Sequence, residues 1–147
     1  MPGYGVLLWI TGPVISKHCD MMKNKLTILI VDDSEIIQEL LKLCLKSLGH
    51  SGVIVNNGEA ALRCLEGRQF DLILMDVTMP VMDGLTALKR LRTKEQDGPD
   101  RTPVILITGH DLPSDQVNYT AAGADGFLSK PIQVELLARE IHRVTGS

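Results

Sequence analysis

Five polar residues of this chain could act together in one reaction, because each stands at or just after the end of an apolar run. They are Asp32, Asp33, Asp76, Thr108 and Lys130. Carboxylates held close together repel one another, and the repulsion raises a pKa or demands a cation. Magnesium is a suitable cation, because it typically binds one or two carboxylates together with waters and phosphate oxygens. With an ammonium and a hydroxyl beside them, the carboxylates suit the transfer of a phosphoryl group.

The three aspartates differ in their surroundings, which suggests different roles. Asp32 and Asp33 form an adjacent pair, an arrangement suited to holding a metal ion. Asp76 stands alone before the loop 79–84, which is rich in turn-forming residues. A carboxylate can accept a phosphoryl group as an aspartyl phosphate. We therefore assign Asp76 as the phosphoacceptor.

The apolar runs have the length and composition of buried strands, and helical patterns lie between them. Ser34 is a suitable N-cap for the first helix, and Gly49 is a suitable stop. The expected strands cover 26–31, 53–55, 70–75, 104–107 and 125–128. The expected helices cover 36–48, 59–65, a segment around 85–91, 114–122 and 132–144, with a polar loop at 93–102.

The first expected helix carries apolar residues at two neighbouring sets of positions. Such spacing predicts one apolar stripe that faces the core. The stripe would consist of Ile36, Leu40, Cys44 and Leu48, with Ile37, Leu41 and Leu45 beside them.

Strands that alternate with helices indicate parallel strands joined by right-handed crossovers. We therefore predict an α/β fold, a flavodoxin-like doubly wound five-stranded parallel sheet of order 2-1-3-4-5 with five helices. In that order the first and third strands are neighbours, so Asp32, Asp33 and Asp76 would lie close together. Ligands of such sheets bind beyond the carboxyl ends of the strands, where these residues stand.

Each residue also has an ordinary structural explanation. The aspartate pair could cap a helix and interact with its dipole. Asp76 and Thr108 could be turn residues, and Lys130 could be a solvated charge. Several such residues at the same edge of one sheet are harder to explain singly, and this coincidence favours a site.

Composition excludes several other classes of protein. The net charge of −3 and the aromatic content of 3% argue against direct nucleic-acid binding. The three cysteines are odd in number and lack CxxC spacing, which argues against a disulfide framework or a zinc site and suits a reducing cytoplasm.

Residues 1–24 form an N-terminal extension, either flexible or the product of a start codon set too far upstream, and residues 25–147 form the domain. The apolar run 6–10 is short and is followed by Gly12 and Pro13, so it cannot span a membrane. No positive charge precedes it as in a signal peptide. We expect no membrane partner.

Four segments, in order and at suitable spacing, resemble the receiver domain of two-component response regulators. The resemblance covers about residues 25–145 and implies magnesium-dependent phosphorylation of Asp76. The donor would be a histidine kinase or a histidine phosphotransfer domain. The segments are LIVDDSE (29–35), LILMDVTMPVMDG (72–84), VILITG (104–109) and ADGFLSKPI (124–132).

The resemblance also implies the metal ligands. Asp33, Asp76 and the backbone carbonyl of Thr78 would bind Mg²⁺ directly, and Asp32 would act through a bound water. We expect that Mn²⁺ can substitute. Thr78 and His110, two residues beyond Asp76 and Thr108 respectively, would tune the lifetime of the phosphorylated form.

The resemblance further implies a conformational switch. Thr108 and Lys130 would contact the phosphoryl oxygens, and the Lys130–Pro131 bond would be cis. On phosphorylation Thr108 would move toward the phosphate, and Phe127 would turn inward. The face made by the fourth helix, fifth strand and fifth helix would then change its affinity for an unidentified protein partner. The ordinary alternative for Phe127 is a core side chain.

Three functions remain open at this point. The first is a phosphoacceptor switch, which is not an enzyme beyond its own phosphorylation and dephosphorylation. The second is a receiver-like interaction module that works without phosphorylation. The third is a phosphohydrolase with an aspartyl phosphate, although such hydrolases usually carry a DxD spacing after the first strand. No output domain follows the last helix, so we expect a stand-alone regulator or a fragment of a hybrid kinase.

Overall fold

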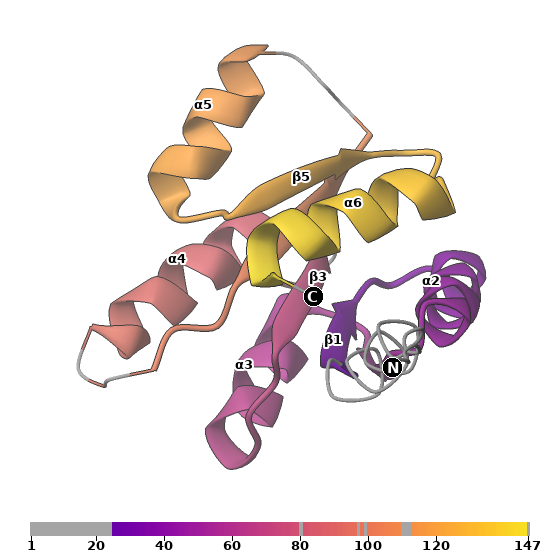
Figure 1. Ribbon diagram of the computed structural model, residues 1–147. Helices are drawn as coiled ribbons and strands as arrows, with labels where there is room; N and C mark the ends of the chain where they lie inside the picture. Colours follow the sequence, from indigo (N-terminus) through magenta and orange to yellow (C-terminus); the bar gives the residue numbers. More distant parts are fainter. Residues whose placement is uncertain (1–24, 80, 97, 99, 110–112, 147) are drawn as a thin grey trace, which may run out of the picture.

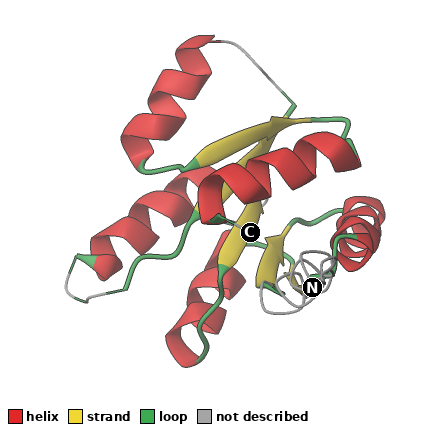
Figure 2. Cartoon of the chain, viewed as in Figure 1, coloured by secondary structure: helices red, strands yellow, loops and turns green. Residues whose placement is uncertain are grey.

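A computed structural model of the chain describes residues 25–79, 81–96, 98, 100–109 and 113–146. Strands and helices alternate throughout this part (Figures 1 and 2). The strands are β1 (Thr27–Val31), β2 (Ser51–Val55), β3 (Leu72–Asp76), β4 (Val104–Thr108) and β5 (Gly126–Ser129). The helices are α2 (Glu35–Ser47), α3 (Gly58–Gly67), α4 (Gly84–Glu95), α5 (Pro113–Ala122) and α6 (Val134–Thr145).

The five strands form one parallel sheet of order β2-β1-β3-β4-β5. This is the predicted order, so the predicted fold is confirmed. Strand β1 pairs in parallel with both β2 and β3. Strand β2 is therefore added on one side of β1 and the later strands on the other, so the strand order reverses at β1. The carboxyl ends of β1, β3 and β4 therefore lie side by side, which brings together the residues that follow them.

Helices cover both faces of the sheet (Figure 1). Buried residues of α2 and α6 share one cluster with the side chains of one sheet face. Residues of α3, α4 and α5 share the other cluster. Strands β3 and β4 are buried at every position, as expected for central strands covered on both sides.

Several element boundaries differ from the predicted ones. Strand β2 starts at Ser51 rather than Val53, and β3 includes Asp76. Helix α4 continues to Glu95 through residues predicted as a polar loop. The ion pair between Arg92 and Glu95, three residues apart, contributes to the stability of this polar last turn.

The prediction of a single apolar stripe on α2 is wrong in part. Leu41 and Leu45 are fully buried, but Ile36 is 80% exposed and Leu43 is 65% exposed. Leu40 also lies on the exposed side. The apolar positions extend around more of the helix than the sheet can cover, so the outer part of α2 remains apolar and open to solvent.

The N-terminal extension 1–24 lies outside the described residues, so its predicted flexibility is not tested. Within the part of the chain that the structure describes, no helix is long and apolar enough to cross a membrane.

Candidate functional site

Neighbouring strands bring the three aspartates to one edge of the sheet. Val31 pairs with Met75, so Asp32 and Asp76 follow directly on adjacent strands. Asp32, Asp33 and Asp76 each offer a carboxylate oxygen, and these oxygens lie within 4.8 Å of one another. We call these three residues together with Lys130 the acidic edge. The clustering expected from the fold is therefore present.

Asp32 is the least solvated of the three, at 1% exposed. Its Oδ1 accepts a hydrogen bond from the Ser34 N–H at 2.8 Å, whereas its buried Oδ2 has no hydrogen-bond partner among the described residues. Burial raises the pKa of Asp32, and the charge of Asp76 raises it further. A buried, unpartnered carboxylate oxygen is unfavourable unless a ligand contacts it.

Asp76 is also buried, at 4% exposed, and it has two polar contacts with described residues. Its Oδ1 accepts a hydrogen bond from the Thr78 N–H at 3.2 Å. Its Oδ2 lies 3.2 Å from Nζ of Lys130, whose side chain is 32% exposed. One ammonium thus faces three carboxylates, of which only Asp33 is exposed to solvent. The acidic edge retains excess negative charge that a cation could neutralise.

The register of the sheet also places Thr108 close to Asp76. Ile107 pairs with Asp76, so the buried Thr108 lies one residue beyond the acceptor on the adjacent strand. Thr108 pairs in turn with Ser129 of β5, and the Thr108 carbonyl accepts the Lys130 N–H at 2.9 Å. The Lys130–Pro131 peptide bond is cis. Thr108 and Lys130 therefore both lie on the β4–β5 side of Asp76, whereas Asp32 lies on the β1 side.

Two supporting residues were not identified from the sequence. Gly84 begins α4, and a Cβ atom there would clash with the carbonyl oxygen of Asp76, so only glycine fits at this position. Gln38 is buried in α2, where its Nε2 donates to the Asp32 carbonyl at 2.7 Å and to Asn56 Oδ1. A polar residue three positions before the buried Leu41 was the available signal for Gln38.

The loop after Asp76 contains a strained residue. Val81 has a φ of 68°, in the left-handed region, and its side chain is 79% exposed. A β-branched residue is rare in this conformation. Strain of this kind is often found at functional sites.

Phe127 lies in β5 between the core and the surface. Its ring is partly buried and lies 5.7 Å from that of Tyr119, measured between centroids. It also borders a surface hollow with Val117 and Thr120 of α5. Phe127 therefore has core contacts on one side and open space on the other.

Of the two positions expected to tune the lifetime of the phosphorylated form, only Thr78 lies among the described residues, and both roles stay predictions. Thr78 follows β3 closely and is exposed beside Asp76. His110 lies outside the described residues, so its placement is not tested.

The acidic edge fits a hard divalent cation. It offers carboxylate oxygens on adjacent strands, one of them buried and without a hydrogen-bond partner among the described residues. Oxygen donors of this kind are the ones that Mg²⁺ prefers, with waters and phosphate oxygens completing its shell.

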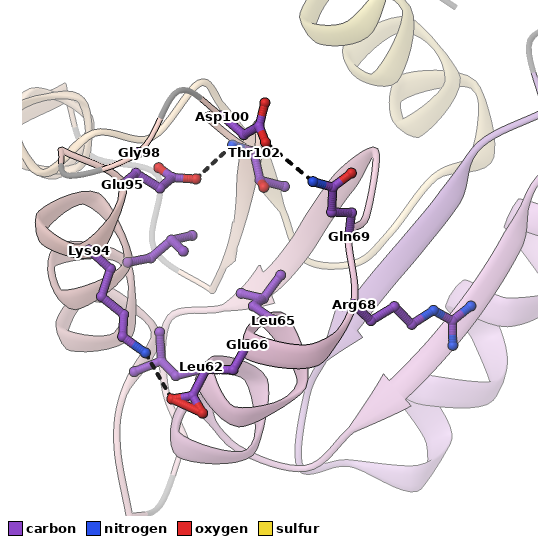
Figure 3. A pocket seen from close by; sticks show the side chains of 11 residues that line it. Leu62, Leu65, Glu66, Arg68, Gln69, Lys94, Glu95, Gly98, Asp100 and Thr102 are labelled. Carbon is purple, nitrogen blue, oxygen red and sulfur yellow. Dashed lines mark hydrogen bonds and ion pairs between the residues drawn. The ribbon is translucent and has the colours of Figure 1, made fainter.

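A second hollow lies near the opposite ends of the strands, between α3 and α4 (Figure 3). Most of its charged side chains have polar partners, and Arg68 lies over the ring of Phe70. Glu66 contacts Lys94 at 3.0 Å, and Glu95 accepts the Thr102 N–H at 2.7 Å. Gln69 donates to Asp100 across the same hollow. This arrangement leaves no clustered like charges comparable to those of the acidic edge.

Comparison with known proteins identifies relatives in two kinds of signalling protein. The chain is 34% identical over 146 residues to a probable histidine kinase 1 of Oryza sativa subsp. indica, covering 80% of this chain and 15% of that protein. It is 36% identical to the two-component response regulator ORR41 of Oryza sativa subsp. japonica, covering 80% of this chain and 92% of the relative. The chain thus spans a small part of the kinase and nearly all of the regulator.

Solved structures give the same result. The receiver domain of the sensor histidine kinase PA1611 from Pseudomonas aeruginosa PAO1 superposes with a TM-score of 0.74 at 35% identity, over 84% of this chain and 99% of that one. That structure holds a magnesium ion coordinated in the active site cleft. Residues 28–142 of the present chain match the response regulator receiver domain family. The chain therefore belongs to the response regulator receiver domain family, as its sequence motifs indicated.

Proposed function

We propose that this chain is a phosphoacceptor switch, in which Asp76 receives a phosphoryl group from a histidine kinase or a histidine phosphotransfer domain. The observation that carries the proposal is the buried cluster of Asp32 and Asp76, with an unpartnered Asp32 oxygen and a lysine in contact with Asp76. The kinase and regulator relatives support this class of partner.

Residues of the acidic edge and the loop after Asp76 would bind the metal ion. Asp33, Asp76 and the Thr78 carbonyl would bind Mg²⁺ directly, and Asp32 would hold it through a water; we expect that Mn²⁺ can substitute. The bound cation would neutralise charge on the acidic edge and on the phosphoryl oxygens. The magnesium ion in the PA1611 receiver domain supports this assignment.

In the transfer step, a carboxylate oxygen of Asp76 forms a bond to phosphorus as the bond between phosphorus and the donor imidazole nitrogen breaks. The imidazole keeps the electron pair of the broken bond. Lys130 contacts Asp76 before the transfer and would contact a phosphoryl oxygen afterwards. The Thr108 hydroxyl would donate to another phosphoryl oxygen.

The added phosphoryl group brings nearly two negative charges and three strong acceptors, which would draw Thr108 toward it. Phe127 would then turn inward, and the face formed by α5, β5 and α6 would change its affinity for a downstream protein. The open hollow beside Phe127 supports this motion, because the ring is not enclosed on that side. Thr78 and His110 would set the rate at which water removes the phosphoryl group.

We further propose that the chain catalyses only its own phosphorylation and dephosphorylation, without nucleic acid or membrane as direct partners. Its cysteine usage favours a reducing, cytoplasmic setting. The alternative of a module that works without phosphorylation is less favoured. The clustered carboxylates of the acidic edge are unfavourable, and such a module would not use them. The adjacent Asp32 and Asp33 do not give the DxD spacing expected of an aspartyl-phosphate phosphohydrolase.

The test is incubation of the purified chain with acetyl phosphate, with and without Mg²⁺, followed by intact-mass spectrometry. We expect one added phosphoryl group that requires Mg²⁺. Asp76→Asn is the matched control, because it removes the nucleophilic carboxylate with little change in shape. It should remain unmodified.

Modification of Asp76→Asn to the same extent would place the acceptor elsewhere. Absence of modification in the native chain, together with absence of Mg²⁺ binding, would favour the module that works without phosphorylation. Repeated turnover of a generic phosphate ester would favour the hydrolase.

A further inference from the structure

The outward side of α2 carries an apolar stripe without a partner among the described residues. Ile36, Leu40 and Leu43 stand at spacings of four and three, which places them on one side of the helix. Their exposed fractions are 80%, 36% and 65%. A contiguous exposed apolar strip of this kind marks an interaction surface. We call these three residues the α2 stripe.

The chain enters the described fold beside one end of this stripe. Lys25, the first described residue, lines a surface hollow together with Leu43 and Lys46 of α2. Gly49 and Ser51 line the other side of the same hollow. The residues that precede Lys25 are therefore connected to the domain at the edge of the α2 stripe.

The preceding segment contains a matching apolar run. Residues 6–10 read Val-Leu-Leu-Trp-Ile and carry no charge. Fourteen residues, 11–24, separate this run from Lys25. Fourteen residues can span up to about 50 Å, whereas a helix of 13 residues is about 20 Å long. The run can therefore reach any part of the α2 stripe.

We propose that the apolar run 6–10 binds the α2 stripe of its own chain. Tethering favours this occupant over a second copy of the chain, because a short linker gives an effective concentration on the order of millimolar. Contact between uncharged apolar side chains on both sides would remove Ile36, Leu40 and Leu43 from water. It would also explain how a helix that is apolar on both its inner and outer sides is accommodated in a soluble domain.

Trp9 provides a direct test, because it is the only tryptophan in the sequence and lies within the proposed run. In the full chain we expect its fluorescence emission to be shifted to the blue relative to free tryptophan, with weak quenching by acrylamide. Both properties should be independent of protein concentration. The double substitution Ile36→Glu with Leu43→Glu should shift the emission to the red and restore quenching.

Val117→Glu is the matched control. Val117 is 68% exposed, but it lies on α5, so its substitution should leave the Trp9 emission unchanged. Leu8→Glu provides a second variant that leaves α2 intact and should also expose Trp9. Circular dichroism and urea unfolding would establish that each variant is folded.

Three results would overturn the proposal. The first is solvent-like emission of Trp9 in the native full chain. The second is a shielded Trp9 that neither the α2 double substitution nor Leu8→Glu exposes, which would mean that the run binds elsewhere. The third is shielding that appears only as the protein concentration rises, which would identify a second copy as the occupant.

Discussion

The two ends of the sheet treat charge in opposite ways. At the acidic edge, three carboxylates face one ammonium, and a buried oxygen of Asp32 has no hydrogen-bond partner among the described residues. Near the amino ends of β4 and β5, Arg92 contacts Glu95 at 2.6 Å and Asp125 at 2.9 Å. We call Arg92, Glu95 and Asp125 the paired edge.

The donors and acceptors of the paired edge make further hydrogen bonds to the backbone. Arg92 also donates to the carbonyls of Thr102 and Gly123, and Asp125 accepts the Val104 N–H. Arg101 also contacts Asp125 at 2.7 Å, so two guanidinium groups balance the two carboxylates. The hydrogen bonds of this region join α4 to β4 and β5. The paired edge therefore stabilises the fold, whereas the acidic edge keeps an unfavourable arrangement of charge that a ligand can relieve.

The largest expected loss of stability follows from breaking the paired edge. Arg92→Ala leaves two mostly buried carboxylates without their main partner, and we expect it to lower the free energy of unfolding by about 3 kcal/mol. Urea denaturation would measure the loss. Arg101→Ala is the control, because Arg101 also contacts Asp125 but its side chain is 51% exposed. Its loss should stay under about 1 kcal/mol. Equal losses in the two variants would contradict a special role for Arg92.

A smaller and pH-dependent effect is expected at Glu140, which continues the hydrogen bonding near β5. Its hydrogen bond with Arg143 lowers its pKa below the ordinary 4.5, and the bond from the Phe127 N–H contributes to the same shift. The ionised form therefore stabilises the fold. Glu140→Gln should reduce the free energy of unfolding at neutral pH by about 2 kcal/mol.

The pH profile of that difference gives the check. It should be fully present above pH 4.5 and disappear as the pH falls through the lowered pKa of Glu140. A difference that persists unchanged at lower pH would show that packing, rather than charge, is responsible.

At the acidic edge we expect the free energy of unfolding to depend on pH in the opposite direction. Burial raises the pKa of Asp32, so without a metal ion the native chain binds this proton more tightly than the unfolded chain. The free energy of unfolding should therefore fall as the pH rises from 3.8 through the raised pKa. Asp32→Asn should lack this fall and be more stable at neutral pH by on the order of 1 kcal/mol. A less stable Asp32→Asn chain in the absence of divalent ions would contradict this account.

The smallest effect concerns backbone strain. Beside the paired edge the residue with a positive φ is Gly123, whereas in the loop beside the acidic edge it is Val81. Val81→Gly should raise the melting temperature slightly, with a gain under about 1 kcal/mol, because relief of the strain is partly offset by the entropy of glycine in the unfolded chain. Val81→Ala retains a side chain at the same φ and should gain nothing. An equal gain from both substitutions would exclude backbone strain as the cause.

The sequence predicted the acidic edge well because its geometry follows from strand order. Once β1 and β3 are neighbours, the residues that end them must meet. The paired edge was not predicted. Arg92 and Asp125 are 33 residues apart, on a helix and beside a strand, and no periodic spacing relates them. Their contact depends on how α4 packs, which local patterns do not specify.

Helix α2 illustrates a different limit. Periodicity identified it as an amphipathic helix, and Ser34 caps it as predicted. Periodicity could not show how wide a part of its surface the sheet covers. Ile36 is exposed because it lies on the part of α2 that the sheet does not cover. Gln38 is buried because Asp32 and Asn56 accept hydrogen bonds from its side chain.

The most direct test of the contrast between the two edges is urea unfolding with and without Mg²⁺. Asp33→Asn is the matched variant, because Asp33 belongs to the acidic cluster but is exposed and should not disturb packing. We predict that Mg²⁺ at ten times its dissociation constant raises the free energy of unfolding of the native chain by about 1.4 kcal/mol. Arg92→Ala should retain this gain, and Asp33→Asn should lose it. A native chain whose stability Mg²⁺ leaves unchanged would contradict the claim that a cation relieves the acidic edge.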